Sequence, residues 1–261
     1  MLGHDRPSRV ECSPLTDLLL VTDLDHTLVG DPLALGELNV KLKALRHRVS
    51  LCYCTGRSLG SARELQREQG LLDPDAWATG VGSSLLWRGE AIPAWDRALR
   101  QGWERQRLQR LLSGMNGLRL QDAAEQSPYK LSYELGEMLP PEACAPFVED
   151  VRRRLNEAGL TARVVFSSAV QLDLLPPSAG KGAVAGFLQT MLGLRPDQVL
   201  CCGDSGNDSS MLGGPWWGVM VANARPELIS WWEQHRPNTL LRATRSYAGA
   251  ISEALETLPL L

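Results

Sequence analysis

Acidic side chains gather at two points of the sequence, each directly after a run of apolar residues. Asp23 and Asp25 follow the run Leu18–Thr22, and Asp204 and Asp208 follow a second run near the other end of the chain. If both runs are strands of one parallel sheet, their carboxyl ends share an edge, which is where such sheets bind ligands. Four carboxylates in one crevice repel one another unless a cation neutralises them. This all-oxygen donor set favours Mg²⁺ over zinc.

Each aspartate taken singly could instead cap the helix that follows it, which is a common role for this residue type. Capping accounts poorly for all four together, so we prefer the metal site. Groups suited to a phosphate complete it: Thr55 and the backbone of Gly56 follow another apolar run, and Asn207 lies in the second acidic cluster. Lys181 stands between two glycines at the start of a predicted helix, whose positive end attracts anions. We therefore predict that Thr55, Gly56, Lys181 and Asn207 bind phosphate.

The elements that must position these groups alternate between strands and helices. Continuous apolar runs predict strands covered on both faces; they are Leu18–Thr22, Val49–Cys54, Ala76–Val81, Gln198–Cys202 and Gly218–Val221. Periodicity and end signals predict helices over Ser61–Gln69, Val184–Leu192 and Pro226–His235. Such alternation predicts an α/β fold with a doubly wound parallel (Rossmann-like) core.

The middle of the chain has a different pattern. In Tyr129–Leu135 and Gln171–Leu175 apolar and polar residues alternate, as in an antiparallel sheet with one solvated face. Helices are predicted over Arg97–Leu112 and around residues 143–155. We therefore expect an inserted α+β cap at 88–175, a core made of 17–87 and 176–261, and a flexible leader at 1–16. The polar face of the cap sheet is either plain solvent surface or the roof of a site, and periodicity leaves both open.

Charge and composition exclude several classes of protein. The 261 residues include 27 basic and 30 acidic side chains, and the net charge of −3 argues against nucleic acid or an anionic membrane as partner. No apolar run approaches the roughly 20 residues of a membrane-spanning helix. The six cysteines lack the spacing of zinc or redox motifs, which predicts buried, reduced thiols. We expect a cytoplasmic monomer.

Four motifs resemble, in order, those of the haloacid dehalogenase superfamily of phosphatases. They are Asp23-Leu-Asp25-His-Thr27, Thr55-Gly-Arg57, Lys181, and Gly203-Asp204-Ser-Gly-Asn207-Asp208. A cap inserted between the second and third motifs is similar to the subclass that acts on sugar phosphates. Over roughly 17–255 the resemblance is stronger to the sucrose-phosphate phosphatases, in the segments Val21–Leu28, Leu172–Pro176 and Val221–Leu228. Ser84 departs from this pattern, because the family usually carries Glu there, and this bears on sugar specificity.

The resemblance implies roles for individual residues. Asp23 would be the nucleophile, and Asp25 the acid that protonates the leaving oxygen and then the base that activates water. The carboxylates of Asp23 and Asp204, with the backbone carbonyl of Asp25, would hold Mg²⁺, while Asp208 would ligate the ion or orient its shell. Thr55, Gly56, Lys181 and Asn207 would contact the phosphate. The residues that we expect to contact the sugar are Arg57, Ser58, Lys130, Ser132 and Asp173.

The implied reaction is hydrolysis of sucrose 6-phosphate to sucrose and phosphate through an aspartyl-phosphate. One alternative keeps the chemistry and changes the sugar, to another disaccharide or glycoside phosphate such as mannosylfructose phosphate. A second alternative is a non-catalytic homologue that regulates a sugar-phosphate synthase. A sucrose-phosphate synthase is also a candidate partner of an active enzyme.

Overall fold

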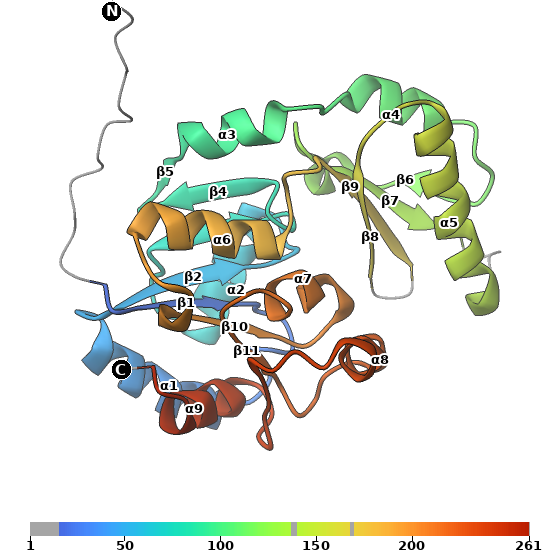
Figure 1. The fold of residues 1–261 in the computed structure, drawn as a ribbon. Coiled ribbons are helices and arrows are strands. Elements are labelled where there is room, and N and C mark those ends of the chain that lie inside the picture. Colours follow the sequence, from blue (N-terminus) through green and yellow to red (C-terminus); the bar gives the residue numbers. More distant parts are fainter. Residues whose placement is uncertain (1–15, 137–139, 168–169, 261) are drawn as a thin grey trace, which may run out of the picture.

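The computed structural model describes residues 16–136, 140–167 and 170–260, so that nearly all of the predicted leader lies outside the described residues (Figure 1). Strand β1 (Leu18–Thr22) lies near the middle of an eight-stranded sheet of order β12-β11-β10-β1-β2-β3-β4-β5. The other strands are β2 (Val49–Cys54), β3 (Ala76–Thr79), β4 (Ser84–Trp87), β5 (Glu90–Ala91), β10 (Val199–Gly203), β11 (Trp217–Met220) and β12 (Leu240–Arg242). From β12 to β3 the strands are parallel, whereas β4 and β5 add an antiparallel edge.

The apolar run of β1 serves both faces of this sheet. Leu18 and Leu20 pack into one hydrophobic cluster, Leu19 and Val21 into another, and all four are fully buried. Helices α1 (Pro32–Leu45), α2 (Leu59–Gln69) and α9 (Ala248–Thr257) cover the first face. Helices α3 (Pro93–Arg100), α6 (Lys181–Leu192), α7 (Ser209–Leu212) and α8 (Pro226–His235) cover the second. The predicted doubly wound core is confirmed.

The register of β1 brings three strand ends to one level. Thr22, its last residue, lies opposite Cys202 of β10 and Tyr53 of β2. The polar segments that follow the three strands therefore leave the sheet side by side, at the edge where parallel sheets bind ligands.

A second sheet lies to one side of the core (Figure 1). It is antiparallel, as predicted, with the order β6-β7-β9-β8. Its strands are β6 (Leu118–Leu120), β7 (Leu131–Leu135), β8 (Arg163–Ser167) and β9 (Gln171–Leu175). Alternate residues such as Leu131 and Leu172 pack with helices α4 (Arg105–Leu112) and α5 (Pro141–Glu157).

The prediction of one helix over Arg97–Leu112 is wrong. The chain forms α3 and α4, and between them Gly102 takes the left-handed conformation with φ 71°. Leu99 of α3 packs into the core, whereas Leu108 of α4 packs into the cap. Since β5 also pairs within the core sheet, packing favours a cap that begins near Gly102 rather than at residue 88. The division into core and cap remains our interpretation.

Short 3₁₀ turns complete the described elements: η1 (Ala123–Glu125), η2 (Pro196–Gln198) and η3 (Gly206–Asp208). Within the described ranges, the structure contains no helix with both the length and the apolar character needed to cross a bilayer.

Candidate active site

A cavity of about 540 Å³ lies between the strand ends of the core and the polar face of the cap sheet. The predicted residues on its core wall are Asp23, Asp25, Thr55, Gly56, Arg57, Asp204 and Asn207. Those on its cap wall are Lys130, Ser132 and Asp173, none of them more than 5% exposed. Of the two interpretations of the polar cap face, the structure thus favours a site wall over a solvated surface.

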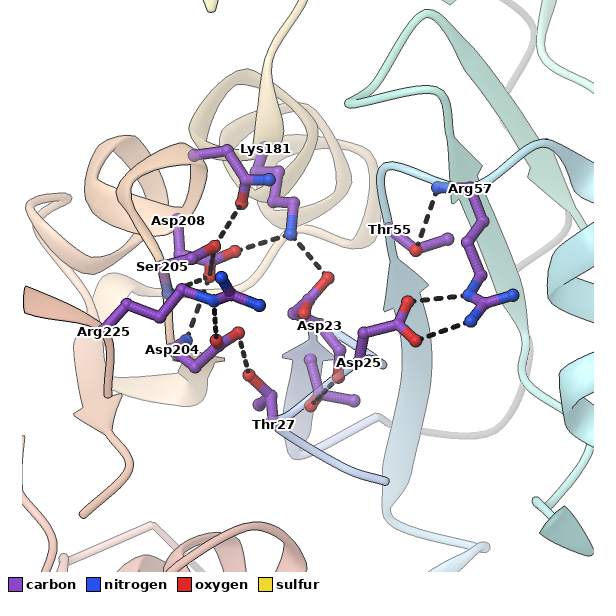
Figure 2. Close-up of polar contacts among 12 residues, drawn as sticks. Asp23, Asp25, Thr27, Thr55, Arg57, Lys181, Asp204, Ser205, Asp208 and Arg225 are labelled. Carbon is purple, nitrogen blue, oxygen red and sulfur yellow. Dashed lines mark hydrogen bonds and ion pairs between the residues drawn. The ribbon is translucent and has the colours of Figure 1, made fainter. Parts of the chain in front are cut away.

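Lys181, in the first turn of α6, does not itself line this cavity but contacts Asp23, which does. Its Nζ donates hydrogen bonds of 2.6 Å to Oδ1 of Asp23 and to Oδ1 of Asp208 (Figure 2). Burial would lower the pKa of Lys181, but the carboxylates of Asp208 and Asp23 raise it above its ordinary value. Burial raises the pKa of Asp23, and the lysine ammonium opposes that shift. Lys181 therefore carries a positive charge against the carboxylate predicted to be the nucleophile.

Asp208 has both carboxylate oxygens engaged. While Oδ1 accepts from Lys181, Oδ2 accepts from the backbone amides of Asp204 and Ser205, at 3.0 and 2.9 Å. Close backbone approach makes this possible, because a Cβ on Gly203 would lie only 2.4 Å from the Cβ of Asp208. These contacts favour an orienting role for Asp208 over direct ligation of a metal.

Asp204 faces the cavity from the end of β10. Its Oδ1 accepts from the Thr27 hydroxyl at 3.1 Å, and its Oδ2 lies 3.4 Å from Nε of Arg225. Burial, and after it the nearby Asp208 carboxylate, raises the pKa of Asp204 from 3.8 to about 6. A carboxylate that is costly to ionise without a nearby cation suits a metal site.

The residues present fit a divalent ion. Oxygen atoms of Asp23, Asp204 and Asp208 lie within 4.8 Å of one another, and all-oxygen sets of this kind bind hard cations. The Asp25 carboxylate is not part of this cluster. Its predicted contribution to the metal through the backbone carbonyl stays a prediction.

The Asp25 carboxylate instead forms a two-pronged ion pair with Arg57. Nε and Nη2 of the guanidinium donate to its two oxygens, each at 2.7 Å (Figure 2). Nη1 of Arg57 donates to Ser61, and its backbone amide donates to the Thr55 hydroxyl at 3.1 Å. Arg57, predicted to contact the sugar, thus also fixes the resting position of the predicted acid.

One predicted sugar contact lies elsewhere. The Ser58 hydroxyl caps α2 by accepting from the backbone amide of Ser61, and it is Ser61 that lines the cavity. Arg225, which also lines the cavity, was not predicted, although it lies within the segment Val221–Leu228 that resembles the family. Gln121 of the cap carried no motif signal at all, since it lies in a loop after β6.

The cap wall is a connected polar network. Ser132 hydrogen-bonds Asp173, and its hydroxyl lies 3.1 Å from Oε1 of Gln121. Nζ of Lys130 lies 3.6 Å from Oδ2 of Asp173 and 3.8 Å from Glu125. Burial raises the pKa of Asp173, and Lys130 opposes the shift. Donors and acceptors of both charges therefore face the cavity, as recognition of several hydroxyl groups requires.

Comparison with known proteins bears on this arrangement. Residues 16–258 match the family model of sucrose-6F-phosphate phosphohydrolase. Sucrose-phosphatase 2 of Nicotiana tabacum is 33% identical over 251 residues, which cover 91% of this chain and 58% of that protein. The chain thus spans less than two thirds of that relative's length. Mannosylfructose-phosphate phosphatase of Agrobacterium fabrum is 32% identical over 242 residues, covering 91% of this chain and 95% of that one.

A solved structure agrees over the whole fold. The X-ray structure of the sucrose-phosphatase from Synechocystis, in complex with sucrose and phosphate, is 40% identical with a TM-score of 0.89. The match covers 95% of this chain and 100% of that one. These findings confirm the resemblance to the sucrose-phosphate phosphatases, and the fold is that of haloacid dehalogenase-like hydrolases such as yhjK of Bacillus subtilis. The chain belongs to the sucrose-6F-phosphate phosphohydrolase family.

Proposed function

We propose that this chain is a Mg²⁺-dependent phosphatase that hydrolyses sucrose 6-phosphate to sucrose and phosphate. One observation carries the proposal: Asp23, paired with Lys181, lies on the core side of a polar cavity whose opposite wall is formed by the cap. The 40% identity to a sucrose-phosphatase solved with sucrose and phosphate supports the choice of sugar.

In the first step, Asp23 attacks the phosphorus and the bond from phosphorus to the sugar oxygen breaks. Asp25 donates a proton to that oxygen as it leaves. To do so, Asp25 has to give up its ion pair with Arg57, because both of its carboxylate oxygens accept hydrogen bonds from the guanidinium. Arg57 thereby holds the acid beside the site until substrate arrives.

In the second step, Asp25 takes a proton from water, which attacks the phosphorus and releases phosphate from Asp23. Lys181, Thr55, Asn207 and the backbone of Gly56 donate toward the transferring oxygens, where charge develops. Asp23 and Asp204 would hold Mg²⁺, with Asp208 orienting its neighbours. The bound ion supplies positive charge that offsets the negative charge of the phosphoryl group.

The cap would choose the sugar. Lys130, Ser132 and Asp173 face the cavity opposite Asp23, so a sugar bound beyond the phosphate meets them first. Because these side chains are buried, water competes poorly for them, and each hydrogen bond to a sugar hydroxyl group contributes strongly to binding.

We further propose that the protein acts in the cytoplasm, where buried thiols such as those of Cys52 and Cys201 stay reduced.

Mannosylfructose phosphate is the second candidate substrate. Two observations favour keeping it: the similar identity of the Agrobacterium fabrum phosphatase, and Ser84 at a position where the family usually carries Glu. Both candidates share the same phosphoryl chemistry and differ only in what the cap contacts.

The test is phosphate release across a panel of sugar phosphates, with and without EDTA, by the wild-type protein and Asp23→Asn. We expect the highest kcat/KM on sucrose 6-phosphate, no activity in EDTA, and a folded but inactive variant. A higher kcat/KM on mannosylfructose phosphate would replace sucrose 6-phosphate as the proposed substrate and leave the proposed mechanism unchanged. A folded, Mg²⁺-loaded protein that releases phosphate from none of the panel would instead be the non-catalytic homologue.

A further inference from the structure

A second cavity, of about 270 Å³, lies behind the catalytic one, between β8 of the cap and the start of α6. The two cavities share Val81 and Asn207 as wall residues. On its other side the second cavity shares Arg152 and Arg163 with a hollow of about 490 Å³ near Pro177. The three spaces follow one another along the boundary between core and cap.

The second cavity is positively charged. Its wall includes Arg152, Arg163 and Lys181, with no aspartate or glutamate among the residues that line it. The ammonium of Lys181 is shared with Asp23 and Asp208, and Arg152 pairs with Glu149 on the outer side of α5. Arg163 is different, because no carboxylate in the described part of the chain lies within ion-pair distance of it.

The guanidinium of Arg163 lies where few hydrogen-bond acceptors are available to it. Its Nε is buried and has no hydrogen-bond partner among the described residues. It packs against the backbone of Gly180, since a Cβ there would lie 3.2 Å from Cζ of Arg163. Gly180 caps the N-terminus of the 12-residue helix α6, which carries a partial positive charge. Two positive groups in contact, one with an unused donor, form a site that an anion would stabilise.

We propose that this cavity binds inorganic phosphate on its way out of the active site. The inference rests on the proposed function, which generates phosphate at Asp23. Asn207 lines both spaces, and Lys181 of the second cavity hydrogen-bonds Asp23 of the first, so the anion can pass from one set of donors to the next.

Calorimetric titration of the Mg²⁺-loaded protein with inorganic phosphate tests the proposal. The wild-type chain is expected to bind two phosphates, and Arg163→Met, which keeps an unbranched apolar stem against Gly180, to bind one. Arg163→Lys should retain the second site with roughly tenfold weaker affinity, since it keeps a charge and loses the planar fork. Arg153→Met is the matched control: it removes an exposed cation from α5 outside these cavities and should leave two sites.

Kinetics provide an independent measurement. Phosphate should inhibit the wild-type enzyme in a mixed pattern against sugar phosphate, and Arg163→Met in a purely competitive one. Equal stoichiometry and equal inhibition patterns in both proteins would overturn the proposal. Two phosphate sites in a chain that hydrolyses no sugar phosphate would support the anion site and reject the proposed function, so the two failures are distinguishable. Thermal unfolding of each variant checks that loss of the second phosphate site is not caused by unfolding of the protein.

Discussion

The aspartates of this site differ in role because their neighbours differ. Asp23, the proposed nucleophile, meets a buried ammonium, which opposes the rise in its pKa that burial causes. Asp25, two residues on, projects past it to a half-exposed guanidinium. Asp208 is fully buried and uses both oxygens within the protein. The spacing of the residues brings them to one place, and the hydrogen-bond partners assign the chemistry.

The division of labour between Asp23 and Asp25 predicts a distinctive kinetic signature. Asp25→Asn should slow turnover of sucrose 6-phosphate by about 10²–10⁴, the usual contribution of a positioned acid–base group. With p-nitrophenyl phosphate, whose leaving group needs no proton, only hydrolysis of the aspartyl-phosphate should be slow. Rapid mixing should then show a burst of p-nitrophenol equal to the enzyme concentration. A linear time course with no burst would contradict separate roles for the two residues.

Protons and the metal should compete for Asp204. Its folded pKa of about 6 lies above the ordinary 3.8, so the metal-free folded state takes up a proton as pH falls through 6. Binding of Mg²⁺ must expel that proton, and its apparent affinity should fall roughly tenfold between pH 7 and pH 5. The stability that protonated Asp204 lends to the metal-free protein is lost as pH rises through 6. Added Mg²⁺ should therefore raise Tm more at pH 7.5 than at pH 5.

Titrations with Mg²⁺ followed by calorimetry, together with thermal unfolding at both pH values, check this competition. Asp204→Asn is the control, because it removes the titrating group. It should weaken Mg²⁺ binding and make the remaining Mg²⁺ affinity nearly independent of pH. An Mg²⁺ affinity that is the same at pH 5 and pH 7 in the wild-type protein would show that no group titrating near 6 binds the metal.

At the scale of elements, continuous apolar runs were predictable and irregular joints were not. Strands β1, β2 and β9 and helix α8 have the predicted bounds, because burial leaves a continuous apolar run in a strand covered on both faces and a periodic pattern in an element covered on one. The pattern over residues 97–112 is helical on both sides of Gly102, but the two halves bury their apolar faces in different clusters. The site follows the same rule: Asp23, Thr55 and Asp204 directly follow strands, whereas Arg225 and Gln121 come from loops without periodicity.

Helix α6 carries two glycines whose substitution should have opposite effects. A Cβ on Gly182 would lie 2.3 Å from the backbone oxygen of Ser210, so Gly182→Ala should force α6 from α7 and destabilise the fold by about 1–3 kcal/mol. Because Lys181 is adjacent, kcat should fall as well. On Gly186 a Cβ would meet only Trp216 at 3.7 Å, and Gly186→Ala should stabilise by about 0.5–1 kcal/mol with kcat unchanged.

Urea unfolding and kcat measured on the two alanine variants test this contrast. Equal stability changes at the two positions would mean that the close approach of α6 to α7 does not constrain the helix. Loss of stability at Gly182 with full activity would separate the position of Lys181 from the packing of these helices.

At the scale of the whole molecule, the cavity separates two kinds of recognition. The core wall offers the carboxylates and hydrogen-bond donors that we propose to bind the metal and the phosphoryl group. The cap wall offers a cation, a hydroxyl and a carboxylate in a network with Gln121 and Glu125. Since the cap strands pack into a hydrophobic cluster of their own, separate from the two clusters of the core, specificity can be altered on one side without disturbing the phosphoryl chemistry on the other.

The cap residues should therefore affect the sugar and spare the phosphate. Lys130→Ala and Asp173→Ala should lower kcat/KM for sucrose 6-phosphate by roughly tenfold to a hundredfold, the value of one hydrogen bond to a charged group. Turnover of p-nitrophenyl phosphate, which lacks the sugar, should stay near the wild-type rate. Each single variant leaves a buried charge without its partner, so the double variant Lys130→Met/Asp173→Asn controls for damage to the cap.

Equal loss on both substrates would indicate impaired folding or closure, and no loss on either would mean that the sugar binds elsewhere. Only a loss confined to the sugar phosphate, in both singles and the double, supports the cap as the element that selects the substrate.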